Sequence, residues 1–238
     1  MGSLDNRIAI VTGGSGALGR AVTTTLVKEG ARVAVPYIVD AEVPLLEGAV
    51  GSGKSQLLIN KADVGVESEV SRFVKQVEEQ MGRIHILVNL VGGFWGGVSV
   101  ADTALADWQA MFDLNLKPTF LCCRAVIPAM RKNKWGRIVS VTSRTGLTGA
   151  GDFAAYAVAK GAIATFTVSL AEELLGDDIL VNAVAPSTID TEANRKAMPN
   201  AKHERWVKPD NIARTIAYLC SDSCSVTSGS IVPVYGRA

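Results

Sequence analysis

Residues 8–19 read Ile8-Ala-Ile-Val-Thr12-Gly13-Gly14-Ser15-Gly16-Ala17-Leu18-Gly19, and a segment of helical periodicity follows over residues 20–29. The apolar, β-branched start predicts a buried strand. Gly14, Gly16 and Gly19 fit the pattern G-x-G-x-x-G in its required place between a strand and a helix. Glycine there lets the backbone turn tightly and approach a pyrophosphate at the positive end of the helix. The stretch favours dinucleotide binding, although ordinary loops also use glycine between a strand and a helix.

Short apolar runs alternate with longer helical patterns along the rest of the chain, which indicates a parallel sheet with crossover helices. We expect an α/β fold: a single Rossmann-type domain over residues 1–238, doubly wound, with helices on both faces of about seven parallel strands. A polar stretch at residues 190–209 interrupts the alternation, and we predict a substrate flap over residues 187–209. The predicted strands are residues 7–12, 32–37, 56–60, 84–89, 137–142, 180–184 and 230–234.

Composition and charge exclude several classes of protein. The 238 residues are 48% hydrophobic and 20% charged, which is typical of a globular protein with a core. A net charge of +1 gives no field to attract nucleic acid or an anionic membrane, so we expect neither partner. We see no signal peptide and no apolar stretch approaching the ~20 residues of a membrane span. We therefore expect a cytoplasmic protein.

The four cysteines are Cys122, Cys123, Cys220 and Cys224, and they form no C-x-x-C pair. With only His85 and His203 to assist them, they do not suggest a zinc site. We interpret the cysteines as reduced, buried thiols and predict no metal.

A second phosphate-binding pattern, G-x-x-x-x-G-K-S, occupies residues 48–55. A functional P-loop has a strand before it and a helix after it, so that the helix N-terminus and the lysine converge on the phosphates. Here a helical segment precedes the pattern and a predicted strand follows. We therefore interpret residues 48–55 as a connecting loop.

Tyr156-Ala-Val-Ala-Lys160 lies in a helical pattern of small residues, which places the phenol and the ammonium one turn apart on the same face. A nearby cation favours phenolate and lowers the pKa of a tyrosine, so Tyr156 is a plausible general acid or base. Y-x-x-x-K also occurs by chance in helices, and the pair needs support from other residues.

Several further motifs give that support, and together they resemble the short-chain dehydrogenase/reductase family along nearly the whole chain. Ser143 lies thirteen residues before Tyr156, a spacing common in that family. The motifs occur in the family's order: residues 12–19, Asp63-Val64, residues 89–92, Asn115, Ser143, Tyr156 with Lys160, and residues 181–187.

The resemblance implies a hydride transfer between a nicotinamide cofactor and a carbonyl or alcohol. Ser143 would bind the substrate oxygen, Tyr156 would move its proton, Lys160 would hold the nicotinamide ribose, and Asn115 would position a water that links Lys160 to solvent. Such donors suit an oxygen that becomes an alkoxide. Besides Tyr156 and Lys160, the cofactor contacts implied are Gly13, Ser15, Gly16, Leu18, Gly19, Tyr37, Asp63, Val64, Asn89, Val91, Gly92, Pro186, Ile189 and Thr191.

Some residues depart from the family pattern. Ala17 replaces the second glycine, Leu90 and Val91 replace the usual Asn-Ala so that a polar tie between strands is partly lost, and Ser187 replaces a glycine. At the end of the second strand an acidic residue usually binds the ribose of NAD. Tyr37 stands there, with Asp40 slightly later, so we favour NADP weakly over NAD, although no arginine marks a phosphate site.

The substrate is less defined. Residues 186–199 and Trp206 resemble the corresponding stretch of dihydropteridine reductases, which characteristically lack a serine at the position of Ser143. A general ketone or quinonoid reductase is therefore the safer expectation. The residues that we expect to line the substrate site are Phe94, Trp95, Arg144, Phe153 and Trp206, although such aromatic residues are as often packing residues.

Two other functions compete with this interpretation. A non-catalytic nucleotide sensor would keep the fold, but Ser143, Tyr156 and Lys160 are all present. A hydrolase would need a histidine base, whereas His85 lies in an apolar strand pattern and His203 in a polar segment. The resemblance also implies a homo-oligomer, a dimer or a tetramer, built through the helices around Asn115 and Tyr156. The apolar C-terminal strand at residues 231–234 is a further candidate for the subunit boundary.

Overall fold

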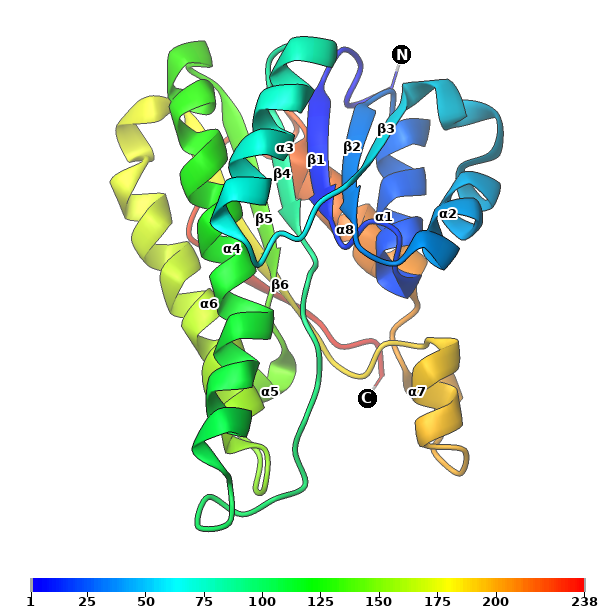
Figure 1. The fold of residues 1–238 in the computed structure, drawn as a ribbon, viewed down its shortest axis with the longest axis vertical. Coiled ribbons are helices and arrows are strands. Elements are labelled where there is room, and N and C mark those ends of the chain that lie inside the picture. Colours follow the sequence, from blue (N-terminus) through cyan, green and yellow to red (C-terminus); the bar gives the residue numbers. More distant parts are fainter. Residues whose placement is uncertain (1, 238) are drawn as a thin grey trace.

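A seven-stranded parallel sheet lies between two layers of helices in the structure, a computed structural model that describes residues 2–237 (Figure 1). The strand order is β3-β2-β1-β4-β5-β6-β7, so the order reverses between β1 and β4. In such sheets, ligands bind beyond the carboxyl ends of the strands at the point of reversal. The strands are β1 (Ile8–Thr12), β2 (Arg32–Tyr37), β3 (Leu57–Lys61), β4 (Ile86–Asn89), β5 (Gly136–Val141), β6 (Ile179–Pro186) and β7 (Ile231–Val234).

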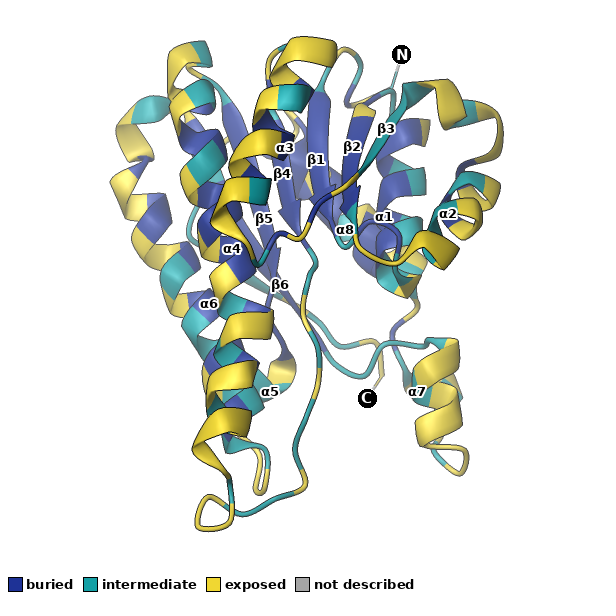
Figure 2. Cartoon of the chain, viewed as in Figure 1, coloured by how far each residue is buried: buried dark blue, intermediate teal, exposed yellow. Residues whose placement is uncertain are grey.

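All seven predicted strands are confirmed, with ends that differ by one or two residues. Apolar runs arise because successive side chains of a strand enter different cores. In β1, Ala9 and Val11 pack into one core, while Ile8 and Ile10 pack into the other. Figure 2 shows the central strands buried and the outer surfaces of the helices exposed.

Two sets of helices cover the sheet. α1, α2 and α8 pack on one face, through residues such as Leu26, Leu46 and Ile216, whereas α3, α4 and α6 pack on the other. The helices are α1 (Ala17–Lys28), α2 (Val43–Val50), α3 (Glu67–Gln80), α4 (Leu105–Asn133), α5 (Arg144–Thr148), α6 (Ala154–Glu173), α7 (Glu192–Ala197) and α8 (Pro209–Cys220). Short 3₁₀ helices are η1 (Asp40–Glu42), η2 (Gly51–Gln56), η3 (Leu175–Asp177) and η4 (His203–Arg205).

α6 corrects one expectation from the sequence. This 20-residue helix contains an 18-residue window with a mean hydropathy of 1.4, so by length and composition it is apolar enough to cross a membrane. The small side chains that make it apolar pack against α4 and the sheet, with Ala159, Ile163 and Ala164 buried. The expectation that no apolar stretch approaches the length of a membrane span is therefore wrong.

The P-loop pattern forms a connection, as expected. Its first three residues end α2, the rest lie in η2 with Lys54, and β3 follows. The Lys54 side chain is about half exposed and lies 3.9 Å from Glu47 across Nζ and Oε2. Because a strand and not a helix follows the lysine, the phosphate-binding geometry of a P-loop is not formed.

The predicted flap contains α7 and η4, and its two ends are joined. Ile189 and Val207 form a parallel bridge, and the amide of Asp190 donates to the carbonyl of Val207 at 2.8 Å. Ser187, where the family often has glycine, donates from Oγ to the Tyr235 carbonyl at 2.7 Å. The C-terminal segment thus holds the start of the flap in place.

Candidate active site

The glycine-rich turn joins β1 to α1 at the carboxyl edge of the sheet. A Cβ atom on Gly19 would lie 2.0 Å from the Gly13 carbonyl oxygen and 2.6 Å from the Gly14 Cα, so the helix packs on the turn only without a side chain there. Gly13 has a φ of +64°, which favours glycine. Ala17 is the exposed first residue of α1, and its methyl group is accommodated.

A cavity of about 400 Å³ opens beside this turn, bordered by the carboxyl ends of β1, β2, β3 and β4. Its volume is in the range of cofactor sites. Leu90, which departs from the family pattern, also lines the cavity, and its amide bonds Thr12 at 3.2 Å, so the neighbouring strands remain tied. The cavity brings together ten of the predicted cofactor residues: Gly13, Ser15, Gly16, Leu18, Gly19, Tyr37, Asp63, Val64, Val91 and Gly92.

Four other predicted cofactor residues lie outside the lining of this cavity. Asn89 is buried in β4, where its Nδ2 donates to Ser140 Oγ at 3.2 Å and ties two strands together. Pro186 ends β6, Ile189 forms the bridge at the base of the flap, and Thr191 caps α7 by accepting from the Asn194 amide at 3.2 Å. Pro186, Ile189 and Thr191 thus lie at and beyond the carboxyl end of β6.

The four predicted catalytic residues come from three different elements. Ser143 follows β5 and caps α5, with its Oγ accepting from the Thr145 amide at 3.1 Å. Tyr156 lies in the first turn of α6 and Lys160 one turn later, while Asn115 is buried in the middle of α4. Tyr156 and Ser143 interact through their hydroxyl groups.

Lys160 and Asn115 converge on the backbone of Gly92. A Cβ atom on Gly92 would lie 2.6 Å from Asn115 Oδ1 and 2.9 Å from Lys160 Nζ, so a side chain here would fill the space into which both groups point. Lys160 Nζ also donates to the Val141 carbonyl at 3.1 Å, and Asn115 Oδ1 accepts from the Gly93 amide at 3.1 Å. Gly92 lines the cavity, so Lys160 and Asn115 lie next to its inner end, behind this glycine.

Burial shifts the pKa values of both Lys160 and Tyr156. It lowers the pKa of Lys160 from 10.5 to about 8 and raises the pKa of Tyr156, which interaction with the Ser143 hydroxyl opposes. The sequence predicted a lowered pKa for Tyr156 because of the nearby cation. That expectation is wrong for this arrangement, since the loss of water outweighs the other influences. Both side chains are shifted toward their neutral forms, so the Tyr156 phenol keeps its proton at neutral pH.

The predicted substrate residues are only partly brought together. The Phe94 ring lies 5.4 Å from Phe153 and 5.0 Å from Tyr156, measured between ring centroids. Trp95 packs in a small cluster with Trp108 and Tyr156. These aromatic side chains form a wall beside the Tyr156 phenol. Phe94 is 67% exposed, so most of its surface is open to a ligand.

The other two predicted substrate residues belong to different contacts. The Arg144 guanidinium lies 5.2 Å from the ring centroid of Tyr235, and the Trp206 ring lies 4.5 Å from His203 in the flap. Neither contact includes the aromatic wall around Tyr156.

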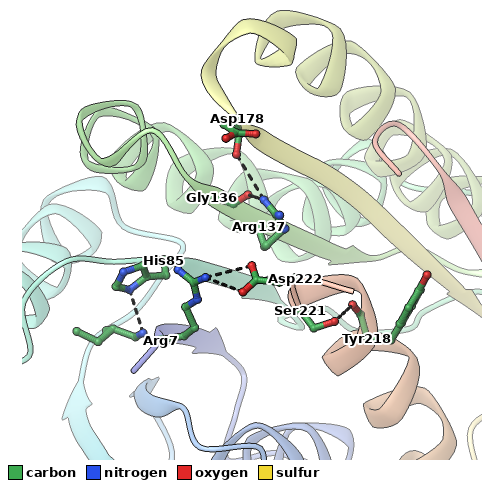
Figure 3. Close-up of polar contacts among 9 residues, drawn as sticks. Arg7, His85, Gly136, Arg137, Asp178, Tyr218, Ser221 and Asp222 are labelled. Carbon is green, nitrogen blue, oxygen red and sulfur yellow. Dashed lines mark hydrogen bonds and ion pairs between the residues drawn. The ribbon is translucent and has the colours of Figure 1, made fainter. Parts of the chain in front are cut away.

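A separate polar cluster occupies the opposite, amino edge of the sheet (Figure 3). Trp135 lies between two arginines there, with the Arg7 guanidinium 3.8 Å and the Arg137 guanidinium 4.4 Å from its ring. Arg7 also pairs with Asp222 at 2.9 Å, and His85 Nδ1 accepts from the Ile8 amide at 3.1 Å. His85 therefore has a structural role, as expected.

The site contains residues that the sequence interpretation missed. Glu42, Ile38 and Val39 line the cavity because the chain turns back toward the glycine-rich turn after β2. Ser15 Oγ donates to Glu42 Oε2 at 2.6 Å, across 27 residues of sequence. An acidic residue some ~20 residues beyond the glycines is a known feature of dinucleotide sites and would have drawn attention to Glu42.

Comparison with known proteins agrees with this geometry. The chain is 34% identical over 229 residues to a 3-oxoacyl-[acyl-carrier-protein] reductase of Synechocystis sp., covering 93% of this chain and 92% of the relative. It is 33% identical to (2S)-[(R)-hydroxy(phenyl)methyl]succinyl-CoA dehydrogenase subunit BbsD of Thauera aromatica, covering 98% and 96%.

A solved structure of levodione reductase superimposes with a TM-score of 0.92 at 27% identity, covering 98% of this chain and 97% of that one. The family model for short chain dehydrogenases matches residues 7–202. With this match and these relatives, the chain belongs to the short-chain dehydrogenase family, whose members named here are oxidoreductases.

Proposed function

We propose that this enzyme reduces a carbonyl group, or oxidises the corresponding alcohol, with Tyr156 as the proton donor or acceptor. The observation that carries the proposal is the convergence of Lys160 and Asn115 on Gly92, beside a tyrosine that contacts Ser143. Each of these groups could have a purely structural role by itself, but a buried lysine whose ammonium lies beside the cavity-lining Gly92 is typical of a functional site.

The residues present fit a nicotinamide dinucleotide. The turn at Gly13 to Gly19 brings backbone amides and the start of α1 to the cavity, where a pyrophosphate would bind. Lys160, whose Nζ lies beside Gly92, would hold the nicotinamide ribose at the inner end. When bound, the cofactor supplies or accepts the hydride.

In this proposal, the protein's own residues stabilise the substrate oxygen and transfer a proton to it. The substrate oxygen would sit between the Ser143 and Tyr156 hydroxyls, which stabilise the negative charge that develops on it during reduction. Tyr156 gives up its proton to this oxygen. Lys160 and Asn115 restore the proton through water at Gly92, because both present polar atoms to that point.

The flap of residues 187–209 and the aromatic wall complete the substrate site in this proposal. The named relatives act on a 3-oxoacyl thioester and a phenyl-bearing succinyl-CoA compound, and a neighbouring structure is a levodione reductase. We therefore place the substrate among ketones or the corresponding alcohols. Quinones and quinonoid pteridines belong in the same screen because of the sequence resemblance in residues 186–199.

The test measures the binding and oxidation of NADH and NADPH across that panel, with wild type, Tyr156→Phe and Tyr218→Phe. Tyr218 is an exposed tyrosine of α8 and serves as the matched control. Loss of the phenolic proton should reduce turnover by about 10²–10⁴-fold and leave cofactor binding intact. Binding without turnover on any substrate would favour a nucleotide sensor instead, and normal turnover by Tyr156→Phe would refute the assigned role.

We also propose that copies of the chain associate through α4 and α6. The outer faces of these helices expose Phe120, Val158 and Val168, each more than 40% accessible. Clustered apolar exposure of this kind marks protein interfaces. Light scattering of the purified protein should show a dimer or tetramer, and a monomer at micromolar concentration would contradict the proposal.

A further inference from the structure

The charges at the outer end of the cavity distinguish between the two nicotinamide cofactors. Glu42 and Asp63 both line the cavity, and among its lining residues in the described part of the chain none is a lysine or an arginine. NADP differs from NAD by a phosphate on the 2′ oxygen of the adenosine ribose. A lining that has carboxylates and no cation repels that phosphate.

The nearest cations are engaged elsewhere. Arg20 Nη1 donates to the Ser15 carbonyl at 2.8 Å, and this side chain lines a different hollow, between α1 and α8. Lys61 Nζ pairs with Asp40 at 2.7 Å on the exposed side of β3. Neither side chain lines the cavity, so neither cancels the charge of Glu42 there.

Glu42 is held in a fixed position beside the glycine-rich turn. Ser15 is buried, and its Oγ donates to Glu42 Oε2 at 2.6 Å, which leaves Oε1 as an acceptor. The Asp63 carboxylate accepts from the Gly65 amide at 2.7 Å and so stabilises its own loop. Glu42 is thus bonded to the glycine-rich turn, where the pyrophosphate would bind, whereas Asp63 is bonded within its own loop. Glu42 is therefore the carboxylate that the adenosine ribose would meet beside the pyrophosphate.

We propose that Glu42, presented by Ser15, binds the 2′ and 3′ hydroxyls of the adenosine ribose and makes the enzyme selective for NAD(H). A ribose diol donates two hydrogen bonds to one carboxylate, whereas a 2′-phosphate has no proton to give and adds like charge. This inference rests on the proposed function and deepens it. It reverses the weak preference for NADP that followed from Tyr37 alone, because the chain brings an acidic residue back to the ribose from η1.

The experiment titrates NADH and NADPH into the wild-type protein, Glu42→Gln and Glu47→Gln, with cofactor fluorescence as the readout. Glu47 lies in α2, about half exposed and outside the cavity lining, so it controls for the loss of one nearby negative charge. We expect wild type to bind NADH on the order of 100-fold more tightly than NADPH. Glu42→Gln should narrow this ratio by roughly tenfold or more, and Glu47→Gln should leave it unchanged.

Two additional measurements test whether the cofactor preference arises at the adenosine ribose and whether the Glu42→Gln variant is folded. Adenosine 5′-monophosphate and adenosine 2′,5′-bisphosphate, used as competitors, should show the same preference, because the discrimination lies at the ribose. Thermal unfolding of Glu42→Gln should match wild type, which shows that the variant is folded.

Equal or tighter binding of NADPH by wild type would overturn the inference, as would an unchanged ratio in Glu42→Gln. Failure of both cofactors to bind would refute the proposed function itself, which is a different result.

Discussion

Replacement of Lys160 by methionine should stabilise the cofactor-free protein while removing its activity. Lys160 is 6% exposed, and burial lowers its pKa because the ammonium has lost its water. At about 1.4 kcal/mol for each pH unit, the fall from 10.5 to about 8 corresponds to about 3 kcal/mol of destabilisation at neutral pH. The hydrogen bond to the Val141 carbonyl returns about 1 kcal/mol, so we expect a net gain of about 2 kcal/mol for Lys160→Met.

The pH dependence has a definite sign. The folded pKa lies below the unfolded one, so stability is greatest above 10.5 and is lost as the pH falls toward about 8. Urea unfolding at about pH 7 and about pH 9.5 should therefore show wild type gaining about 2 kcal/mol relative to Lys160→Met at the higher pH. Lys75→Met, at an exposed lysine of α3, is the control and should change stability by less than about 0.5 kcal/mol. A destabilised Lys160→Met whose deficit is the same at both pH values would refute the reasoning.

Two further substitutions test the turn and the amino edge. Gly19→Ala should lower the free energy of unfolding by about 1–3 kcal/mol and weaken cofactor binding, because its Cβ would meet the backbone of Gly13 at 2.0 Å. The pKa of His85 is lowered by burial and by Arg7, so unfolding should become easier as the pH falls below about 6.5, and His85→Asn should flatten that slope in thermal melts between about pH 7 and 5.

The Gly19→Ala and His85→Asn predictions can each be contradicted by a specific result. Gly48→Ala in α2 places its Cβ in open space, so it should raise stability by about 0.5–1 kcal/mol. A Gly19→Ala protein that melts as Gly48→Ala does would contradict the packing argument. A His85→Asn protein that keeps the acid sensitivity of wild type would assign that sensitivity to another group.

The strands, and the placement of Tyr156 and Lys160 on one helix, could be predicted from local patterns in the sequence. A strand covered on both faces must be apolar throughout, as in residues 8–12, and a phenol one helical turn from an ammonium is visible as spacing in the sequence. Single helices such as α7 were not predicted, because Glu192–Ala197 is short, polar and exposed and has no periodicity to detect.

Other properties depend on tertiary structure and either could not be predicted from the sequence or were predicted wrongly. Glu42 meets Ser15 only because η1 turns the chain back after β2, and no local pattern specifies that turn. The raised pKa of Tyr156 comes from burial beneath neighbouring elements, whereas the spacing to Lys160 suggested the opposite direction. Charge spacing along a helix indicates which groups are neighbours, but not how much water they keep.

The position of Trp135 between Arg7 and Arg137 has a practical optical consequence. This indole is at the amino edge of the sheet, whereas Trp95 and Trp108 lie in the segments around Tyr156 and Trp206 lies in the flap. The sequence contains four tryptophans in all, so two sets of emission signals arise without an added dye. A variant that keeps only Trp135 would report global unfolding, and one that keeps only Trp206 would report motion of the flap while the sheet stays intact.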